Sequence, residues 1–161
     1  MVECVKYTKE YAPLIHDYQL TNDDLRFTMS PRKAMESSDP ALHHILVLDQ
    51  GQLVTFFSLD ETTRSEPFSD NAQALIIRFF STDTRYQGLG YGQQVFQVLP
   101  AFIEKYFPAT TEIVLAVNAQ NEAGQALYKK CGFRETMQYA HGRTGAVNIM
   151  RKDLQKQKVL A

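Results

Sequence analysis

Cysteine is scarce in this sequence, and its scarcity excludes two classes of small protein. Cys4 and Cys131 lie far apart and form no CxxC spacing. A disulfide-rich fold needs several cysteine pairs, and a structural zinc site needs clustered ligands. We therefore expect both thiols to be free, and we expect no metal site.

Long apolar runs and an excess of charge of one sign are also missing. No segment approaches the length of a membrane span, and residues 1–11 carry four charged side chains where a signal peptide would be apolar. The formal net charge is -1, so no overall field attracts nucleic acid or an anionic membrane. These features predict a cytoplasmic protein with a small-molecule or peptide partner, and neither nucleic-acid nor membrane binding.

What the sequence does contain is typical of one globular domain. Its 161 residues are 44% apolar and 22% charged, which suffices for a hydrophobic core. Apolar patterns and turn residues predict strands at 2–7, 44–48, 53–59, 74–80, 112–117, 133–139 and 146–151. Helical spacing and capping residues predict helical segments at 11–20, from 23, and at 31–37, 93–106 and 121–130. We expect a single α/β domain over residues 1–161, with a mixed, mostly antiparallel central sheet of about six or seven strands flanked by helices.

The most informative segment is the turn that follows the strand predicted at 74–80. It contains Gly88, Gly90 and Gly92 and leads into a predicted helix. Glycines allow close approach of a ligand, and the free amides and dipole of a helix N-terminus favour an anion. The turn is therefore a candidate diphosphate site. A glycine turn that serves packing alone is the alternative.

Two other phosphate-binding loops do not match this turn. A P-loop requires Gly-Lys followed by Ser or Thr, whereas Gly92 is followed by Gln93 and Gln94. A dinucleotide-binding loop requires G-x-G-x-x-G in an early βαβ unit, whereas this turn lies late in the chain, after a predicted hairpin. Both interpretations are therefore disfavoured.

Two segments of the sequence resemble motifs of the GNAT superfamily of N-acetyltransferases. Residues 87–92 read Gln-Gly-Leu-Gly-Tyr-Gly and resemble its Gln/Arg-x-x-Gly-x-Gly/Ala motif. Residues 121–133 resemble its Asn-x-x-Ala-x-x-Leu-Tyr-x-x-x-Gly-Phe motif, with Gly124 in place of alanine. The resemblance, strongest over 74–133, implies a GNAT-like fold. It also implies transfer of an acetyl group from acetyl-coenzyme A to a primary amine of a small molecule or peptide.

The resemblance further implies which residues act in the site. The segment whose backbone binds the pantetheine arm of acetyl-coenzyme A, the cosubstrate, matches Phe80, Ser81 and Thr82, and Asn121 matches an asparagine that contacts the same arm. The diphosphate loop matches Gln87, Gly88, Leu89, Gly90, Tyr91, Gly92 and Gln93. Tyr128 matches the tyrosine that protonates the departing thiolate. Independently of the resemblance, the helical repeat places Asn121 and Tyr128 nearly two turns apart on one helix face.

Two points of this interpretation stay open. Without the two motifs, Tyr128 would be interpreted as a half-buried side chain of an amphipathic helix. Many relatives carry a glutamate base on the strand predicted at 112–117, where this sequence has Ala116, and Glu112 is expected at the far end of that strand in a structural role. A water chain, or His43 or His44, could remove the amine proton instead.

The alanine at position 116 also leaves a second class of function open. A coenzyme A-binding sensor or interaction module would keep the glycine turn without catalysing turnover. Acetyl-coenzyme A consumption across a panel of amines separates this class from an enzyme. The acceptor is open as well, because amino acids, polyamines, drug amines and protein termini all fit. The oligomeric state is also open, with a homodimer among the alternatives.

Overall fold

The computed structural model describes residues 1–61, 69–142 and 145–154, and within them seven strands form one sheet. The strands are β1 (Glu3–Lys6), β2 (Leu42–Asp49), β3 (Gln52–Asp60), β4 (Ala74–Thr82), β5 (Glu112–Asn118), β6 (Arg134–Gly142) and β7 (Gly145–Asp153). The α-helices are α1 (Ala12–Asp17), α2 (Pro31–Ala34), α3 (Tyr91–Tyr106) and α4 (Glu122–Lys130), and the 3-10 turns are η1 (Lys9–Tyr11), η2 (Asp24–Arg26) and η3 (Thr84–Tyr86).

The strand order is β1-β2-β3-β4-β5-β7-β6. Every neighbouring pair is antiparallel except β4 and β5, which are parallel. The mixed, mostly antiparallel sheet predicted from the sequence is therefore confirmed. Among the described residues, no helix is long and apolar enough to cross a membrane.

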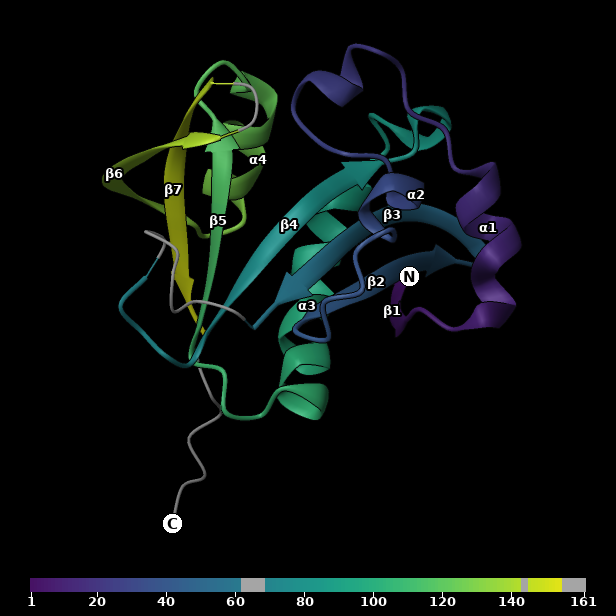
Figure 1. Cartoon of the computed structure of the whole chain (residues 1–161), viewed down its shortest axis with the longest axis horizontal. Helices are drawn as coiled ribbons and strands as arrows, with labels where there is room; N and C mark the ends of the chain where they lie inside the picture. The colour runs from purple at the N-terminus through teal and green to yellow at the C-terminus, as the bar shows by residue number, and fades with distance from the viewer. Residues whose placement is uncertain (62–68, 143–144, 155–161) are drawn as a thin grey trace.

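Helices cover both faces of the sheet, with α3 and α4 on one face and α1 and α2 on the other (Figure 1). The alternation of side chains along β2 explains the two layers. Ile45 and Val47 point into the core under α3, whereas Leu46 and Leu48 pack with residues of α1 and α2. Burial of one such side chain contributes about 1.5–3 kcal/mol to the free energy of folding. The strand therefore stabilises both layers.

Several predicted boundaries in the N-terminal third are wrong. The helix predicted at 11–20 ends at Asp17, because Tyr18 has extended backbone dihedrals and its hydroxyl bonds to Ser81. The helical segment predicted from residue 23 is only the 3-10 turn η2. Helix α2 is shorter than predicted, but its predicted N-cap is confirmed: Ser30 Oγ accepts the Lys33 N–H at 3.2 Å.

The strands β4 and β5 separate partway along their length (Figure 1). Their pairing ends at Ile77 and Leu115, after which β4 follows β3 and β5 follows β7. At the same point a bulge in β4 sets Phe79 and Phe80 opposite Phe57, and Phe79 has a φ of 59°. A positive φ in a residue with a side chain costs of order 1–3 kcal/mol, and such strain gathers at functional sites. The separation opens the middle of the sheet.

Both cysteines are free thiols, as predicted. Burial raises the pKa of Cys4 to about 12, and burial also raises the pKa of Cys131. The raised pKa values keep both thiols protonated near neutral pH. Because the thiolate is the reactive form, both are weakly nucleophilic.

Candidate active site

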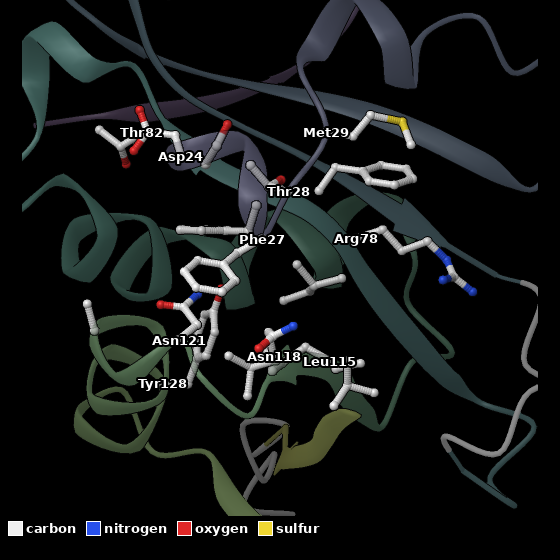
Figure 2. A pocket seen from close by; sticks show the side chains of 18 of the residues that line it. Asp24, Phe27, Thr28, Met29, Arg78, Thr82, Leu115, Asn118, Asn121 and Tyr128 are labelled. Atoms are coloured by element: carbon white, nitrogen blue, oxygen red, sulfur yellow. The ribbon is translucent and has the colours of Figure 1, made fainter. Parts of the chain in front are cut away.

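The separation of β4 and β5 opens a cavity of about 420 Å³. Residues 76–82 of β4 form one wall, and residues 115–118 of β5 face them. Further lining comes from residues 20, 23, 24 and 27–29, and from Asn121, Ala123 and Tyr128 at α4. Figure 2 shows Asn121 and Tyr128 on one side of the cavity and Asp24 and Met29 on the other. Segments distant in the sequence therefore meet at one place.

The predicted site residues fall into two groups. The cavity lining includes Phe80, Ser81, Thr82, Gln87, Asn121 and Tyr128. The exposed turn and the first helical turn of α3 hold Gly88, Leu89, Gly90, Tyr91, Gly92 and Gln93. Because Gln87 belongs to the cavity wall and directly precedes the turn, the structure brings both sequence motifs to the same site.

The geometry of the turn suits an anion. Gly88 and Gly90 have φ values of 76° and 84°, and Gly90 is the N-cap of α3. The first hydrogen bond of the helix runs from the Gln94 N–H to the Gly90 carbonyl oxygen at 3.2 Å. The preceding amides, at residues 91–93, therefore have no partner within the helix and lie at the positive end of its dipole. This arrangement fits the diphosphate of a coenzyme A molecule.

Gly92 serves a different purpose from the other two glycines. A Cβ atom added to it would lie 2.9 Å from Leu127 Cδ2. The absence of a side chain at Gly92 therefore lets α3 pack closely on α4. For this glycine, the packing interpretation holds.

The side chains of Tyr91 and Gln87 both form hydrogen bonds with other residues of the protein. The Tyr91 hydroxyl donates to the Asp49 carboxylate, which turns its ring toward the β2–β3 hairpin. Gln87 Nε2 donates to the Thr82 carbonyl oxygen at 3.0 Å and to Asp24 Oδ1 at 3.1 Å. Any contact of Tyr91 with a diphosphate is therefore made by its backbone.

Tyr128 lines the cavity and packs within a cluster of aromatic side chains. Its ring is 8% exposed and lies edge-on to Phe80, Phe96 and Phe133, with centroids 5.8–6.0 Å apart. Burial raises the pKa of its hydroxyl. The side chain therefore keeps its proton at neutral pH and can act as a donor toward the cavity.

Asn121 is the N-cap of α4, and its Oδ1 accepts the Gly124 N–H at 2.9 Å. A Cβ atom added to Gly124 would lie 2.5 Å from Asn121 Nδ2. The glycine that departs from the family motif therefore accommodates the capping side chain in this conformation. Asn121 lines the cavity next to α4 while it caps the helix.

The structure narrows the choice of a general base. Ala116 is exposed to the cavity, whereas Glu112 lies at the other end of β5 and accepts a hydrogen bond from Ser69 at 2.8 Å, in keeping with a structural role. His43 pairs with Glu61, and His44 Nδ1 lies 2.9 Å from Ser58 Oγ. Neither histidine is among the described residues that line the cavity. Burial and the adjacent His43 lower the pKa of His44, so it is neutral near pH 7.

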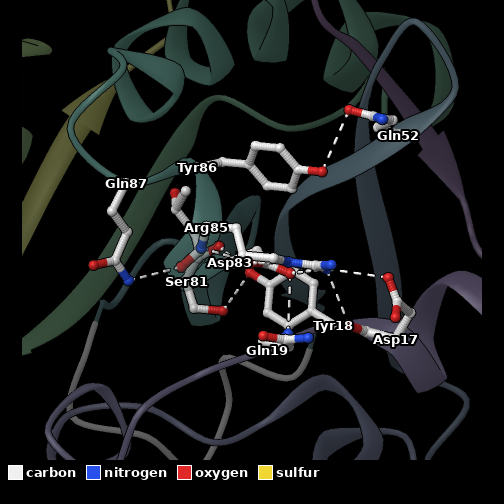
Figure 3. Close-up of polar contacts among 10 residues, drawn as sticks. Asp17, Tyr18, Gln19, Gln52, Ser81, Asp83, Arg85, Tyr86 and Gln87 are labelled. Atoms are coloured by element: carbon white, nitrogen blue, oxygen red, sulfur yellow. Dashed lines mark hydrogen bonds and ion pairs between the residues drawn. The ribbon is translucent and has the colours of Figure 1, made fainter.

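Sequence reasoning missed a polar network directly beside the site (Figure 3). Asp83 is fully buried, and its carboxylate accepts hydrogen bonds from the Arg85 side chain at 2.8 and 3.0 Å and from the Gln19 N–H at 3.0 Å. Burial alone would raise the pKa of Asp83, but these bonds outweigh it and lower the pKa. Arg85 also reaches Asp17 at 3.1 Å. The only sequence signal was an acidic residue just after an apolar strand.

The wall of the cavity formed by residues 20–29 was missed as well. Phe27 and Met29 line the cavity from the irregular segment between η2 and α2. No periodic pattern marks residues in such a segment, and only the fold brings them opposite β4 and β5.

Comparisons with known proteins agree with this geometry. Residues 7–133 match the model of the acetyltransferase (GNAT) family. The chain belongs to this family, and it is an acyltransferase. A relative is YbbJ of Bacillus subtilis (strain 168), described as an uncharacterized N-acetyltransferase: it is 34% identical over 130 residues, which cover 79% of this chain and 81% of YbbJ.

Solved structures share the fold at low sequence identity. The aminoglycoside acetyltransferase AAC(6')-Ib in complex with coenzyme A and kanamycin matches with a TM-score of 0.76 and 13% identity over 95% of both chains. Spermidine N-acetyltransferase from Vibrio cholerae in complex with coenzyme A and spermine matches with a TM-score of 0.71 and 17% identity, also over 95% of both chains. At these sequence identities, the similarity shows a shared fold.

Proposed function

We propose that this protein transfers an acetyl group from acetyl-coenzyme A to a primary amine of a small molecule or peptide by direct attack. The observation that supports the proposal most strongly is that three features lie next to one another. The separation of β4 and β5 opens the cavity, Tyr128 lines it with a protonated hydroxyl, and the free amides at the start of α3 follow directly after Gln87 of its wall. Membership of the acetyltransferase family supports it.

We assign the following roles in binding and proton transfer to residues of this chain. The amides of residues 88–93 would hold the diphosphate, while Phe80, Ser81, Thr82 and Asn121 would position the pantetheine arm. The amine nitrogen bonds to the thioester carbonyl carbon as the carbon–sulfur bond breaks. Tyr128 would give its proton to the departing thiolate and regain one from solvent. The proton that the amine loses would pass to water, because Ala116 occupies the position of the family base.

The acceptor class rests on two kinds of support. The structures similar in fold were solved with kanamycin and with spermine, and both of those proteins act on amines. In this chain, Phe27 and Met29 give the wall that we assign to the acceptor an apolar lining, and Ala116 lines the same cavity. An amine that carries an apolar group would gain about 25 cal/mol for each Å² of apolar surface that it buries there.

The proposal is tested by release of coenzyme A from acetyl-coenzyme A in the presence of amines. The panel should contain α-amino acids, polyamines, an aminoglycoside, aryl alkyl amines and a peptide with a free N-terminus. We expect release above the background rate with at least one class, together with an acetylated product in the mass spectrum. Binding of coenzyme A without turnover of any member would instead favour the sensor or interaction module.

A further inference from the structure

The acceptor-side wall of the cavity, residues 20–29, is joined to the turn proposed to bind acetyl-coenzyme A. We infer that Asp24 and Gln87 are positioning residues, whose hydrogen bond lets coenzyme A in the glycine turn order the acceptor-side wall. The inference rests on the proposed function and adds to it a link between the two halves of the site. It is carried by hydrogen bonds at one end and in the middle of the wall.

The N-terminal end of the wall is fixed to β4 and the turn after it (Figure 3). The Tyr18 hydroxyl donates to the Ser81 carbonyl oxygen at 2.7 Å. The Gln19 N–H donates to Asp83 Oδ2 at 3.0 Å, and the Gln19 carbonyl oxygen accepts the Thr84 N–H at 2.8 Å. A buried carboxylate with several donors therefore attaches this end of the wall to the turn after β4. At its other end the wall leads into α2, whose Pro31 and Ala34 are buried.

Asp24 attaches the middle of the wall to the turn. Gln87 Nε2 donates to Asp24 Oδ1 at 3.1 Å and to the Thr82 carbonyl oxygen at 3.0 Å, so one side chain contacts the wall and β4. Asp24 Oδ2 accepts the Thr21 N–H at 2.8 Å, and the Asp24 N–H donates to Thr21 Oγ1 at 3.1 Å. The Phe27 N–H in turn bonds to the Asp24 carbonyl oxygen. The position of Asp24 therefore affects the position of the segment that begins at Phe27.

The coupling has a physical origin in conformational entropy. Gln87 is exposed and directly precedes Gly88, whose backbone is unusually free. An anion that binds the amides of residues 88–93 restricts this backbone, so that less entropy remains to be lost in holding the Gln87–Asp24 bond. Couplings between sites are typically fivefold or larger, and they are reciprocal: an acceptor bound against the wall would tighten coenzyme A binding by the same factor.

Hydrogen exchange with mass spectrometry tests the inference without knowledge of the acceptor. Coenzyme A alone is the probe. Peptides covering 87–93 report its binding, and peptides covering 20–29 report the wall. In the wild type we expect saturating coenzyme A to slow exchange in both regions, by about fivefold in the wall. In Asp24→Ala the turn should still be slowed, whereas the wall should not respond.

Glu36→Ala is the matched control. It removes a carboxylate with the same change in charge, whose 66% exposed side chain pairs with Lys33 and lies outside the cavity lining. This variant should respond as the wild type does. Gln87→Ala provides a second test if Asp24→Ala fails to fold by circular dichroism, and the double variant should respond no less than either single variant, because both remove the same bond.

The outcomes separate the inference from the proposed function. A wild-type wall that does not respond while the turn does, or a full wall response in Asp24→Ala, overturns the inference and leaves the proposed function standing. If neither region responds and calorimetry detects no coenzyme A binding, both are overturned.

Discussion

At the scale of single residues, Tyr128 has the position and the protonated hydroxyl that a proton donor to a leaving thiolate needs. Its side chain lines the cavity, and its aromatic neighbours exclude water from the ring. Burial raises its pKa above the ordinary tyrosine value of about 10. A raised pKa favours the protonated hydroxyl, so ionisation of Tyr128 should not limit the rate at any pH below about 10.

We predict that Tyr128→Phe lowers kcat by roughly 10²-fold while leaving the Kd of acetyl-coenzyme A unchanged. The substitution keeps the ring and its packing and removes only the donor. Stopped-flow or steady-state kinetics with a good acceptor, under conditions where chemistry limits the rate, measures the effect. Tyr139→Phe is the control, because this tyrosine is 61% exposed and lies outside the cavity lining. A wild-type kcat in Tyr128→Phe would assign the tyrosine to packing.

At the scale of elements, the glycine turn combines two tasks within five residues of sequence. Gly88 and Gly90 supply positive φ values in open space, whereas Gly92 provides room for Leu127 of α4. The same residue type thus shapes the proposed anion site and sets the distance between two helices. Because α4 carries Tyr128, this distance also affects where the hydroxyl lies.

Gly92→Val should lower the free energy of unfolding by about 1–3 kcal/mol, since the added carbons would collide with Leu127. Urea denaturation measures the change. Gln97→Val, at an exposed position of the same helix, controls for the helix propensity of valine. Equal stability of the two variants would show that α3 and α4 can accommodate a side chain at residue 92, and the packing argument would fail.

The sequence predicted the strands and the two long helices because their apolar periodicity is strong. It failed between residues 17 and 35, where tertiary contacts decide the backbone. Tyr18 leaves the helix to bond to Ser81, and Asp24 in the single turn η2 accepts a hydrogen bond from Gln87. Local propensity carries no information about partners that lie more than sixty residues away in the chain.

At the scale of the whole molecule, the site lies at the boundary between two halves of one sheet. Four residue pairs join β4 to β5, and beyond them each strand follows its own half. The two family motifs led to predictions for the end of β4, the glycine turn and α4 with Tyr128. The wall formed by residues 20–29 was not predicted, because Phe27, Met29 and Asp24 come together only through the fold. The single domain over 1–161, the cytoplasmic location and a homodimer stay predictions.

The proposed mechanism depends on binding of acetyl-coenzyme A by the glycine turn, which calorimetric titration measures. The wild type should bind, and Gly90→Val should bind at least about tenfold more weakly. A valine at a φ of 84° is strained and would tilt the amides away from the diphosphate. Gly51→Val places the same strain, at a φ of 81°, in the β2–β3 hairpin and should bind as the wild type does. Failure of the wild type to bind, or unchanged affinity in a folded Gly90→Val, would show that the glycine turn is not the acetyl-coenzyme A site.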